Sequence, residues 1–415
     1  MQATDRTILH IDINNCYASI ECLHRPEIRD KPVVVGGDEE ARHGIVLAKN
    51  YVAKKFDIKT GETLWQARQK CRDLVVVPPN YPLYLRFSKL AREIYMDYSN
   101  QFEPFGIDEG WLDVTGSVGL FGSGEQIAEL IRERIKFELG ITVSIGVSWN
   151  KIFAKLGSDM KKPDAITVIT KENYKEKVWP LPVDDLLYVG RATGTKLHNY
   201  SFHTIGALAT APSDFLLQRF GKMGAVIQIF ANGLDNSQVC DFGYESPIKS
   251  IGNSTTTPRD LLNEEDVKII IYVLSESVAA RMREQGFRCK TVSISVRDNE
   301  LGWYQKQGKV TSPTDLACVI QAKAMELFKA SYKWFKPIRS IGVRATDFLG
   351  CDNIQLMIYD DENKREKQKH LEEAVDGLRR RFGAYAVQRG IMLADRGLSG
   401  FDPKNDHVIH PMGYF

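Results

Sequence analysis

No stretch of the sequence stays apolar for the roughly 18 residues that a helix needs to span a bilayer. The opening residues, MQATDRTILHID, lack a basic region followed by a long apolar core, so we expect no secretory signal peptide. The sequence also contains no internal repeat and no low-complexity tract. These absences argue against a membrane protein and a repeat protein.

Cysteine is scarce and scattered. The sequence has seven cysteines, and no two of them have the CxxC spacing of zinc sites and redox pairs. This excludes a small disulfide scaffold, argues against a zinc site and is typical of a reducing compartment. We therefore expect a cytoplasmic protein.

Charge is distributed unevenly along the chain. The 415 residues suffice for two to four domains, and 43% hydrophobic with 26% charged residues is close to the globular average, which excludes a largely disordered chain. The formal net charge is +2, yet residues 247–346 contain sixteen Lys or Arg and ten Asp or Glu, a net of +6. A basic module joined to a more acidic one is expected of an enzyme acting on nucleic acid, although many solvated surfaces are similarly basic.

Strand and helix patterns alternate through about residue 165, which predicts an α+β or α/β core. We expect strands at 7–13, 31–35, 74–78 and 141–147, a hairpin at 105–114, and helices starting at 17–22 and spanning 45–56, 84–100 and 125–139. Farther along we expect a helical region at 183–233, a linker at 236–244, strands and helices over 247–346, a charged helix at 364–382 and a polar tail at 395–415.

Three acidic residues stand where strands are expected to end or turn. Asp12 ends a buried strand, and Asp108 and Glu109 occupy a tight hairpin. A charge at the end of an apolar strand is costly unless it is paired or bound to metal. Convergent acids could hold two divalent cations about 3.5–4 Å apart, and their hard oxygen ligands suit magnesium. The alternative is an ordinary strand end and an ordinary turn.

Three longer motifs occur in order along the chain: DINNCYASIE from Asp12, GIDEGWLDVT from Gly106 and GVSWNKIFAKLGSDMKKP from Gly146. Together they closely resemble the palm motifs of Y-family DNA polymerases, the DinB/polymerase IV and UmuC group. The resemblance runs from about Ile8 to Gly350. It implies template-directed DNA synthesis past damaged bases, with low fidelity. We also expect no proofreading, because no second set of exonuclease-like acids appears outside the palm.

The resemblance also implies an α+β multidomain, right-hand polymerase. Its parts would be a palm (1–25 and 75–165), small fingers (26–74), a helical thumb with a helix-hairpin-helix (166–235), a linker (236–246), an α/β little finger (247–346), and a C-terminal clamp-binding segment, helix and tail (347–415).

The catalytic residues carried over from the family are Asp12, Asp108 and Glu109, which would bind two Mg2+ ions, or Mn2+ in their place, together with the main-chain carbonyl of Ile13. Asn14 stands where many DinB-type members have a second Asp, so we do not expect it to be a ligand. Asp113 also matches a family acid, with a structural role as plausible as a catalytic one.

The nucleotide-binding residues carried over are Tyr17, Tyr51, Lys54 and Lys155. Tyr17 matches the steric gate, whose ring leaves no space for a 2′-hydroxyl; otherwise it would be a core aromatic residue. Tyr51 and Lys54 lie three residues apart, on one helix face, and resemble the fingers pair that contacts the triphosphate. Lys54 replaces an Arg of many relatives, which predicts a looser grip on phosphate. Each lysine could otherwise simply be solvated.

The DNA-binding residues carried over lie in the thumb and little finger: Gly190, Gly194, Lys196, Ser250, Arg297 and Arg344. The turn glycines resemble a helix-hairpin-helix, whose backbone N–H groups approach a phosphate, although such glycines also serve helix packing. Contacts of this kind make affinity strongly dependent on salt.

Residues 352–359 resemble the peptide by which bacterial polymerases bind the sliding clamp. The clamp-binding residues would be Gln355, Leu356, Ile358 and Tyr359. The alternative is a strand packed within the fold.

The expected partners are primer–template DNA, deoxynucleoside triphosphates and the sliding clamp, with a monomeric enzyme and no membrane. Two other functions stay open at this stage. A GGDEF-type nucleotide cyclase is suggested by Gly36-Gly37-Asp38-Glu39, but it would leave the basic module and Gly106-Ile-Asp-Glu without a role. A non-enzymatic DNA-damage adaptor would be favoured only if the metal-binding acids were missing.

Overall fold

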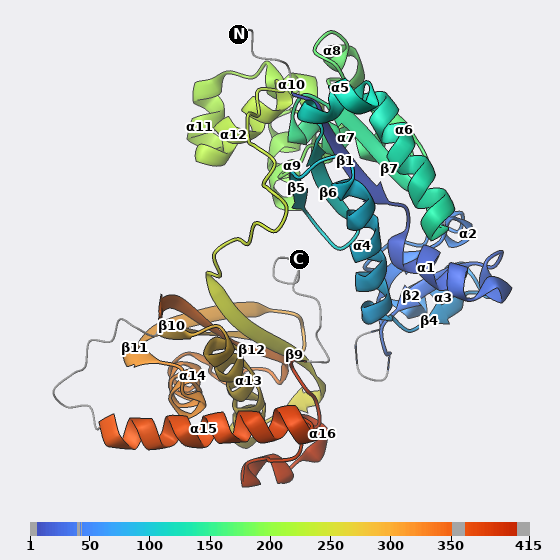
Figure 1. Ribbon diagram of the computed structural model, residues 1–415. Coiled ribbons are helices and arrows are strands. Elements are labelled where there is room, and N and C mark those ends of the chain that lie inside the picture. The colour runs from blue at the N-terminus through green and yellow to red at the C-terminus, as the bar shows by residue number, and fades with distance from the viewer. Residues whose placement is uncertain (1–5, 40–41, 43, 351–361, 405–415) are drawn as a thin grey trace. The chain divides into compact units, whose positions relative to one another are not determined.

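The computed structural model describes residues 6–39, 42, 44–350 and 362–404. The chain forms two compact units that meet in the sequence between Glu245 and Ser246, with the short segment Asp38–Gly44 grouped with the second. Figure 1 shows their elements. No helix in the described part of the chain combines the length and the apolar character that crossing a bilayer requires.

The first unit is built on a five-stranded sheet in the order β5-β6-β1-β7-β8. The strands are β1 (Ile8–Ile13), β5 (Phe102–Pro104), β6 (Glu109–Asp113), β7 (Val143–Ser148) and β8 (Ile166–Val168). β1 lies at the centre, antiparallel to both β6 and β7, and its apolar residues are buried. β1 confirms the strand predicted at 7–13. A hairpin also forms as predicted, but its first strand is β5, which lies before the predicted range of 105–114, and Glu109 begins β6 instead of lying in the turn.

Helices pack on this sheet and support its central strands. They are α1 (Cys16–His24), α4 (Tyr81–Met96), α6 (Gly124–Arg134) and α7 (Lys151–Met160). Gly146 on β7 lets α7 come close, since a Cβ there would collide with the carbonyl of Ala154. The close approach brings the lysines of α7 to the edge of the central strands.

A small three-stranded sheet, in the order β3-β2-β4, occupies the segment expected to be the fingers. It contains β2 (Val33–Gly36), β3 (Val46–Lys49) and β4 (Val75–Val77), with α2 (Tyr51–Lys54) and α3 (Leu64–Lys70). The helix predicted over 45–56 was therefore wrong in its first half. The Asn50 side chain ends the strand and caps α2, because its Oδ1 accepts hydrogen bonds from the N–H groups of Ala53 (2.9 Å) and Val33 (3.0 Å).

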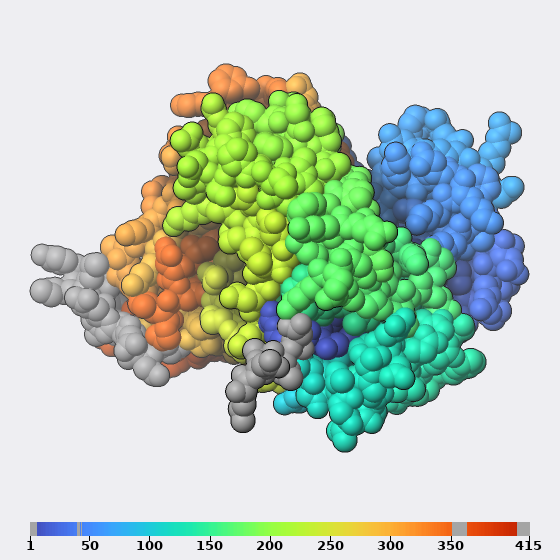
Figure 2. All heavy atoms as spheres, turned by 90° about the horizontal axis from the view of Figure 1, so that it is seen from above, coloured from blue at the N-terminus to red at the C-terminus, as the bar shows by residue number. Residues whose placement is uncertain are grey.

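The predicted helical region at 183–233 is confirmed. Its helices are α9 (Arg191–Asn199), α10 (Ile205–Ala209), α11 (Ser213–Phe220) and α12 (Lys222–Ala231). They enclose an apolar core that they share with Ile152, Phe153 and Leu156 of α7. In Figure 2 these helices form a yellow-green lobe, and the small three-stranded sheet with its helices forms a separate blue one.

The segment expected as a linker, residues 236–244, is irregular but partly packed. Val239 is only 2% exposed and contacts the apolar cluster of Ile8 and Trp111. The N–H of Cys240 donates to the Glu103 carboxylate (3.2 Å). The first half of this segment is thus held on the first unit.

The second unit contains a four-stranded antiparallel sheet in the order β11-β10-β12-β9. Its strands are β9 (Ser250–Leu261), β10 (Phe287–Asp298), β11 (Trp303–Thr314) and β12 (Ile338–Gly350), and its long helices are α13 (Glu264–Glu284), α14 (Ala317–Ser331) and α15 (Glu362–Phe382). α13 and α14 cover one face of the sheet and share its core. The charged helix predicted at 364–382 corresponds to α15, which is joined to this core by a buried ion pair between Glu372 and Arg283 (2.8 Å).

Candidate active site

The three acids singled out in the sequence lie together at one end of β1 and β6. The antiparallel register places Asp12 directly opposite Glu109. Asp108 immediately precedes β6, and its carbonyl accepts a hydrogen bond from the N–H of Ile13 (2.9 Å). Residues almost 100 positions apart are brought together by the pairing of two buried strands.

Burial raises the pKa values of the two aspartates, Asp12 and Asp108. For Asp12, loss of solvent is the largest effect and raises the pKa to about 6, although the neighbouring Lys162 opposes the shift. For Asp108, burial again acts first and the negative charge of Asp12 adds to it, so its pKa is raised as well. Positive charge is therefore favoured at this end of the strands.

Two lysines supply part of that positive charge. Lys155 on α7 places its Nζ 2.5 Å from Glu109 Oε2, and Lys162 places its Nζ 3.0 Å from Asp12 Oδ1. Both also contact Asp159, at 3.2 and 2.9 Å. Burial would lower the pKa of Lys155, but the nearby carboxylates outweigh it and the pKa is raised.

Lys162 is the site residue that the sequence analysis missed. It lies in the KKP ending of the third palm motif, where Lys161 and Lys162 stand before Pro163. That charged pair was the available signal. The contacts with Asp12 and Asp159 distinguish Lys162 from its neighbour.

The carboxylate oxygens that contact lysines are not arranged as a metal site. Among the described residues, no group of three or more His, Cys, Asp or Glu side chains is placed to hold a metal ion. The donors nevertheless fit a hard divalent cation, because carboxylate and carbonyl oxygens are its preferred ligands. A cation would also offset the electrostatic cost of burying the carboxylates of Asp12 and Asp108, the cost that raises their pKa values.

Tyr17 lies beside the acids within a layer of tyrosines. Its ring stacks on Tyr84, with centroids 4.4 Å apart, and meets Tyr81 edge-on at 6.0 Å. Burial raises the pKa of Tyr17, and the negative charge of Asp108 raises it further. The ring is thus held rigidly next to Asp108.

The fingers pair also lies near this end of the sheet. Lys54 Nζ lies 5.6 Å from the centroid of the Tyr51 ring. Burial raises the pKa of Tyr51, and the charges of Lys162 and Asp12 also act on it. Tyr51 therefore lies within electrostatic range of Asp12 and Lys162.

The predicted DNA-binding residues of the helical region have different environments. Gly190 is exposed and precedes α9 as its N-cap, and Lys196 is exposed on the same helix. Gly194 is buried, and a side chain there would collide with the Asp184 carboxylate. The structure thus gives Gly194 a role in packing.

The remaining predicted DNA-binding residues lie on the sheet of the second unit. Ser250 is paired with Thr346, and the exposed Arg344 and Arg297 lie on adjacent strands. The residues that alternate with Arg297 on β10 face the core, so this arginine points to the face opposite α13 and α14. The clamp-binding residues Gln355, Leu356, Ile358 and Tyr359 lie outside the described residues.

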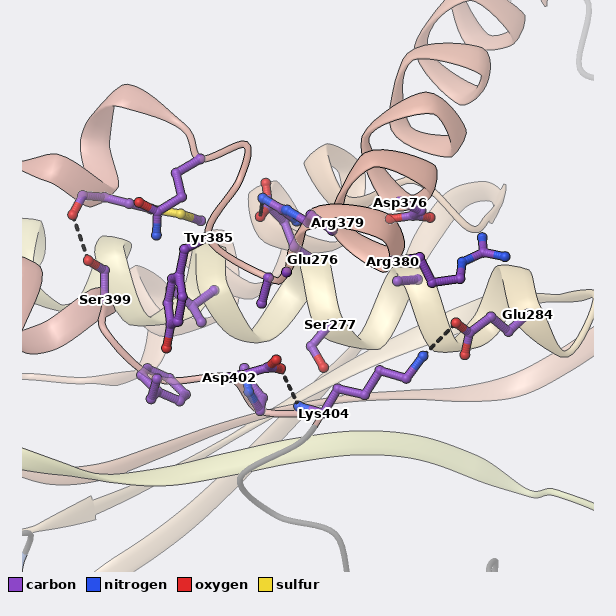
Figure 3. Close-up of a pocket in the computed structure, with 18 residues that line it drawn as sticks. Glu276, Ser277, Glu284, Asp376, Arg379, Arg380, Tyr385, Ser399, Asp402 and Lys404 are labelled. Atoms are coloured by element: carbon purple, nitrogen blue, oxygen red, sulfur yellow. Dashed lines mark hydrogen bonds and ion pairs between the residues drawn. The ribbon is translucent and has the colours of Figure 1, made fainter.

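A cavity of about 380 Å³ lies elsewhere, between α13, α15 and residues 383–404 (Figure 3). Several of its charged side chains pair with neighbours, as in the contacts of Lys404 with Glu284 (2.5 Å) and of Arg379 with Glu276 (2.7 Å). These pairs join the C-terminal segment to α13.

Comparisons with known proteins agree with the resemblance seen in the palm motifs. The impB/mucB/samB family matches residues 11–159, and the C-terminal domain of that family matches residues 248–358. A protein named DNA polymerase IV, from Acetivibrio thermocellus, is 56% identical over 395 residues, which cover 95% of this chain and 99% of that protein. Another DNA polymerase IV, from Moorella thermoacetica, is 36% identical over 399 residues, covering 96% of this chain and 99% of that protein.

The fold agrees with a solved structure of the same group. A Y-family DNA polymerase chimera of Dbh and Dpo4 superposes with a TM-score of 0.72 at 23% identity, covering 83% of this chain and 99% of that one. The α+β multidomain fold expected from the sequence is thereby confirmed. The chain belongs to the impB/mucB/samB family of Y-family DNA polymerases.

Proposed function

We propose that this polymerase adds deoxynucleotides to a primer 3′ end by a two-metal phosphoryl transfer, with low fidelity, past damaged bases and without proofreading. The observation that carries the proposal is the position of Asp12 opposite Glu109, with Asp108 beside them. The pairing brings three carboxylates together, and burial already disfavours the negative charge of two of them, Asp12 and Asp108. Neither a cyclase nor a non-enzymatic adaptor accounts for this cluster together with a basic second unit.

Asp12, Asp108, Glu109 and the carbonyl of Ile13 would hold the two divalent cations, with Mg2+ the expected ion and Mn2+ able to replace it. When bound, the ions supply activation of the 3′-hydroxyl and stabilisation of the leaving pyrophosphate. The contribution of the chain is to place the oxygen ligands on two buried strands, so that their positions are set before substrate arrives.

Lysines would complete the site by binding the triphosphate. Lys155 and Lys162 contact Glu109 and Asp12, so they already lie where the phosphates would meet the acids. Binding of nucleotide with its cations would exchange these ion pairs for lysine–phosphate contacts. Tyr51 and Lys54 would contact the same phosphates from the fingers segment.

The stacked position of Tyr17 suits a steric gate. A rigid ring beside the acid cluster excludes a 2′-hydroxyl better than a mobile one, and the stack on Tyr84 holds it in place. Tyr17 would therefore select deoxyribonucleotides.

The open face of the second unit's sheet would bind DNA. Neighbouring strands place four polar rows across it: Thr256–Ser340–Arg297–Trp303, Ser254–Gly342–Ser295–Gln305, Gly252–Arg344–Ser293–Gln307 and Ser250–Thr346–Thr291–Lys309. These rows contain cations and hydroxyls but no carboxylate. Such a face suits sequence-independent contacts with phosphate, along with Gly190 and Lys196 of the thumb.

The substitution Asp108→Ala tests the proposal. We expect nucleotide addition to be abolished, because the cluster loses a metal ligand, while primer–template affinity stays close to that of the wild type, because DNA is bound mainly by other groups. Primer extension and DNA titration at matched salt measure the two effects. Primer extension that survives the substitution would contradict the assignment.

A further inference from the structure

The turn that carries Asp108 and Glu109 has all of its main-chain carbonyls bonded. Across residues 106–109, two of the four carbonyls are satisfied by the backbone of the hairpin and of β1. The carbonyl of Asp108 accepts from the N–H of Ile13 (2.9 Å), and that of Glu109 accepts from the N–H of Phe105 (3.0 Å). The other two carbonyls receive their hydrogen bonds from outside the sheet.

Both outside donors come from α4. Arg92 donates from Nη2 to the carbonyl of Gly106 (3.1 Å), and Ser88 donates from Oγ to the carbonyl of Ile107. The two side chains lie four residues apart and therefore on one face of the helix. Ser88 is 3% exposed, so the bond at Ile107 is shielded from water.

Arg92 also packs against the first arm of the hairpin. Its guanidinium lies 5.6 Å from the centroid of the Phe102 ring on β5. The Phe102 ring in turn lies against Gly110 on β6, where a Cβ would meet the ring at 2.6 Å. Burial lowers the pKa of Arg92 to about 10, because the guanidinium is largely shielded from water.

We infer that Arg92 and Ser88 are positioning residues for the catalytic acids. They fix the two peptide groups that precede Asp108, so that its carboxylate meets the metal ions at a set place. An arginine used this way acts through the Gly106 carbonyl and not through contact with substrate. The inference rests on the proposed function, since it assigns Asp108 to metal binding.

The substitutions Arg92→Met and Ser88→Ala remove these donors and keep most of the volume. We expect Arg92→Met to lower kcat on the order of 100-fold, as a displacement of about 1 Å in a catalytic group does. We also expect it to weaken the affinity of the metal-free enzyme for Mn2+ about tenfold, as removing the support of metal ligands does. KM for DNA should not change, because Arg92 donates to the turn that carries Asp108 and is not among the proposed DNA-binding residues.

The matched control is Arg86→Met, which makes the same change at a position of α4 outside its buried face. Mn2+ affinity is measured by electron paramagnetic resonance, and thermal melting reports on the fold. Arg92→Lys, which keeps a donor and the charge, should restore part of both activity and Mn2+ affinity. Mn2+ affinity and kcat equal to those of the control would overturn the inference, and so would a fall in melting temperature with no change in Mn2+ affinity.

Asp108→Ala in the same titration separates this inference from the proposed function. If Asp108→Ala retains the wild-type Mn2+ affinity, the assignment of the metal ligands fails and the positioning role fails with it. If Asp108→Ala loses that affinity while Arg92→Met and Ser88→Ala keep it, only the positioning role is refuted.

Discussion

At the scale of single residues, the site is governed by the cost of burying negative charge. Asp12 is a strand residue with a side chain only 14% exposed, and its pKa is raised to about 6 even though Lys162 contacts it. The lysine therefore offsets only part of the missing hydration. The part of the desolvation cost that Lys162 does not offset favours cation binding, because a further positive charge is stabilising there.

This balance predicts how the stability of the metal-free protein depends on pH. Between about pH 4 and pH 6 the folded chain keeps a proton on Asp12 that the unfolded chain has released, so stability falls as pH rises through this window. The shift of about two pKa units corresponds to about 3 kcal/mol at pH 7. Asp12→Asn should therefore raise the free energy of unfolding by up to about 3 kcal/mol at pH 7 and by much less at pH 4.

Urea unfolding in the presence of a chelator measures this effect. Asp30→Asn, the same substitution at an exposed position, is the control. A stabilisation by Asp12→Asn that is equal at both pH values would contradict the prediction.

The tyrosine layer supports a second prediction at the same scale. Tyr17→Ala removes the ring that is stacked on Tyr84 and opens space beside Asp108. We expect the ratio of ribonucleotide to deoxyribonucleotide incorporation to rise at least about tenfold, since a steric clash worth about 1.4 kcal/mol is a factor of ten. Single-nucleotide insertion kinetics with matched nucleotides measure the ratio, and an unchanged ratio would show that Tyr17 is not the gate.

At the scale of elements, side chains that alternate along each strand place apolar residues on one face of the second unit's sheet and polar residues on the other. On β10, Val292, Ile294 and Val296 face the helices, while Ser293, Ser295 and Arg297 alternate with them. A shift of one residue in register would exchange the two faces. The apolar core thus fixes which side chains lie on the open face, the face that we propose binds DNA.

This arrangement predicts a weaker dependence of DNA affinity on salt once an arginine is removed. Arg297→Ala and Arg344→Ala should each weaken primer–template binding, and each should reduce the slope of log affinity against log salt by about 0.9 for every phosphate that the arginine neutralises. Lys268→Ala is the control, because Lys268 is exposed on α13 and so lies on the other side of the sheet. Fluorescence anisotropy over a range of salt concentrations measures the slopes. Equal effects of all three substitutions would argue against a DNA-binding face.

At the scale of the whole molecule, the chain divides its tasks between two units. The first contains the acids and lysines of the candidate active site, and the second contains residues 247–346 with their net charge of +6. Phosphate contacts of this kind are screened by salt, so the polymerase alone should bind DNA weakly.

Tethering to the sliding clamp would compensate for that weak binding by raising the effective concentration at the primer end. Replacing Gln355, Leu356 and Tyr359 by Ala should leave synthesis without clamp nearly unchanged and remove the stimulation by clamp. Primer extension with and without clamp is the measurement. An equal loss in both assays would mean that the segment packs within the fold.

Much of this protein follows from local sequence alone. The apolar run of β1, the charged repeat of α15 and the helical region at 183–233 each contain their own periodicity, and the structure confirms them. The palm motifs also indicated the family, the three candidate acids and the tyrosine proposed as the gate, because they are long and occur in a characteristic order. These features depend on residues that are neighbours in the chain.

Only the tertiary structure decided which distant residues meet. Lys162 reaches Asp12 from far along the chain, and Val239 is buried beside Ile8 although its segment reads as a linker. The sequence pattern predicted a helix at Val46–Lys49, which is a strand. Its conformation depends on pairing with β2 and on the hydrogen bonds of the Asn50 side chain. Such contacts are set by sheet register and helix packing. These bring together residues that are distant in the chain, and the local sequence around each residue does not indicate the contact.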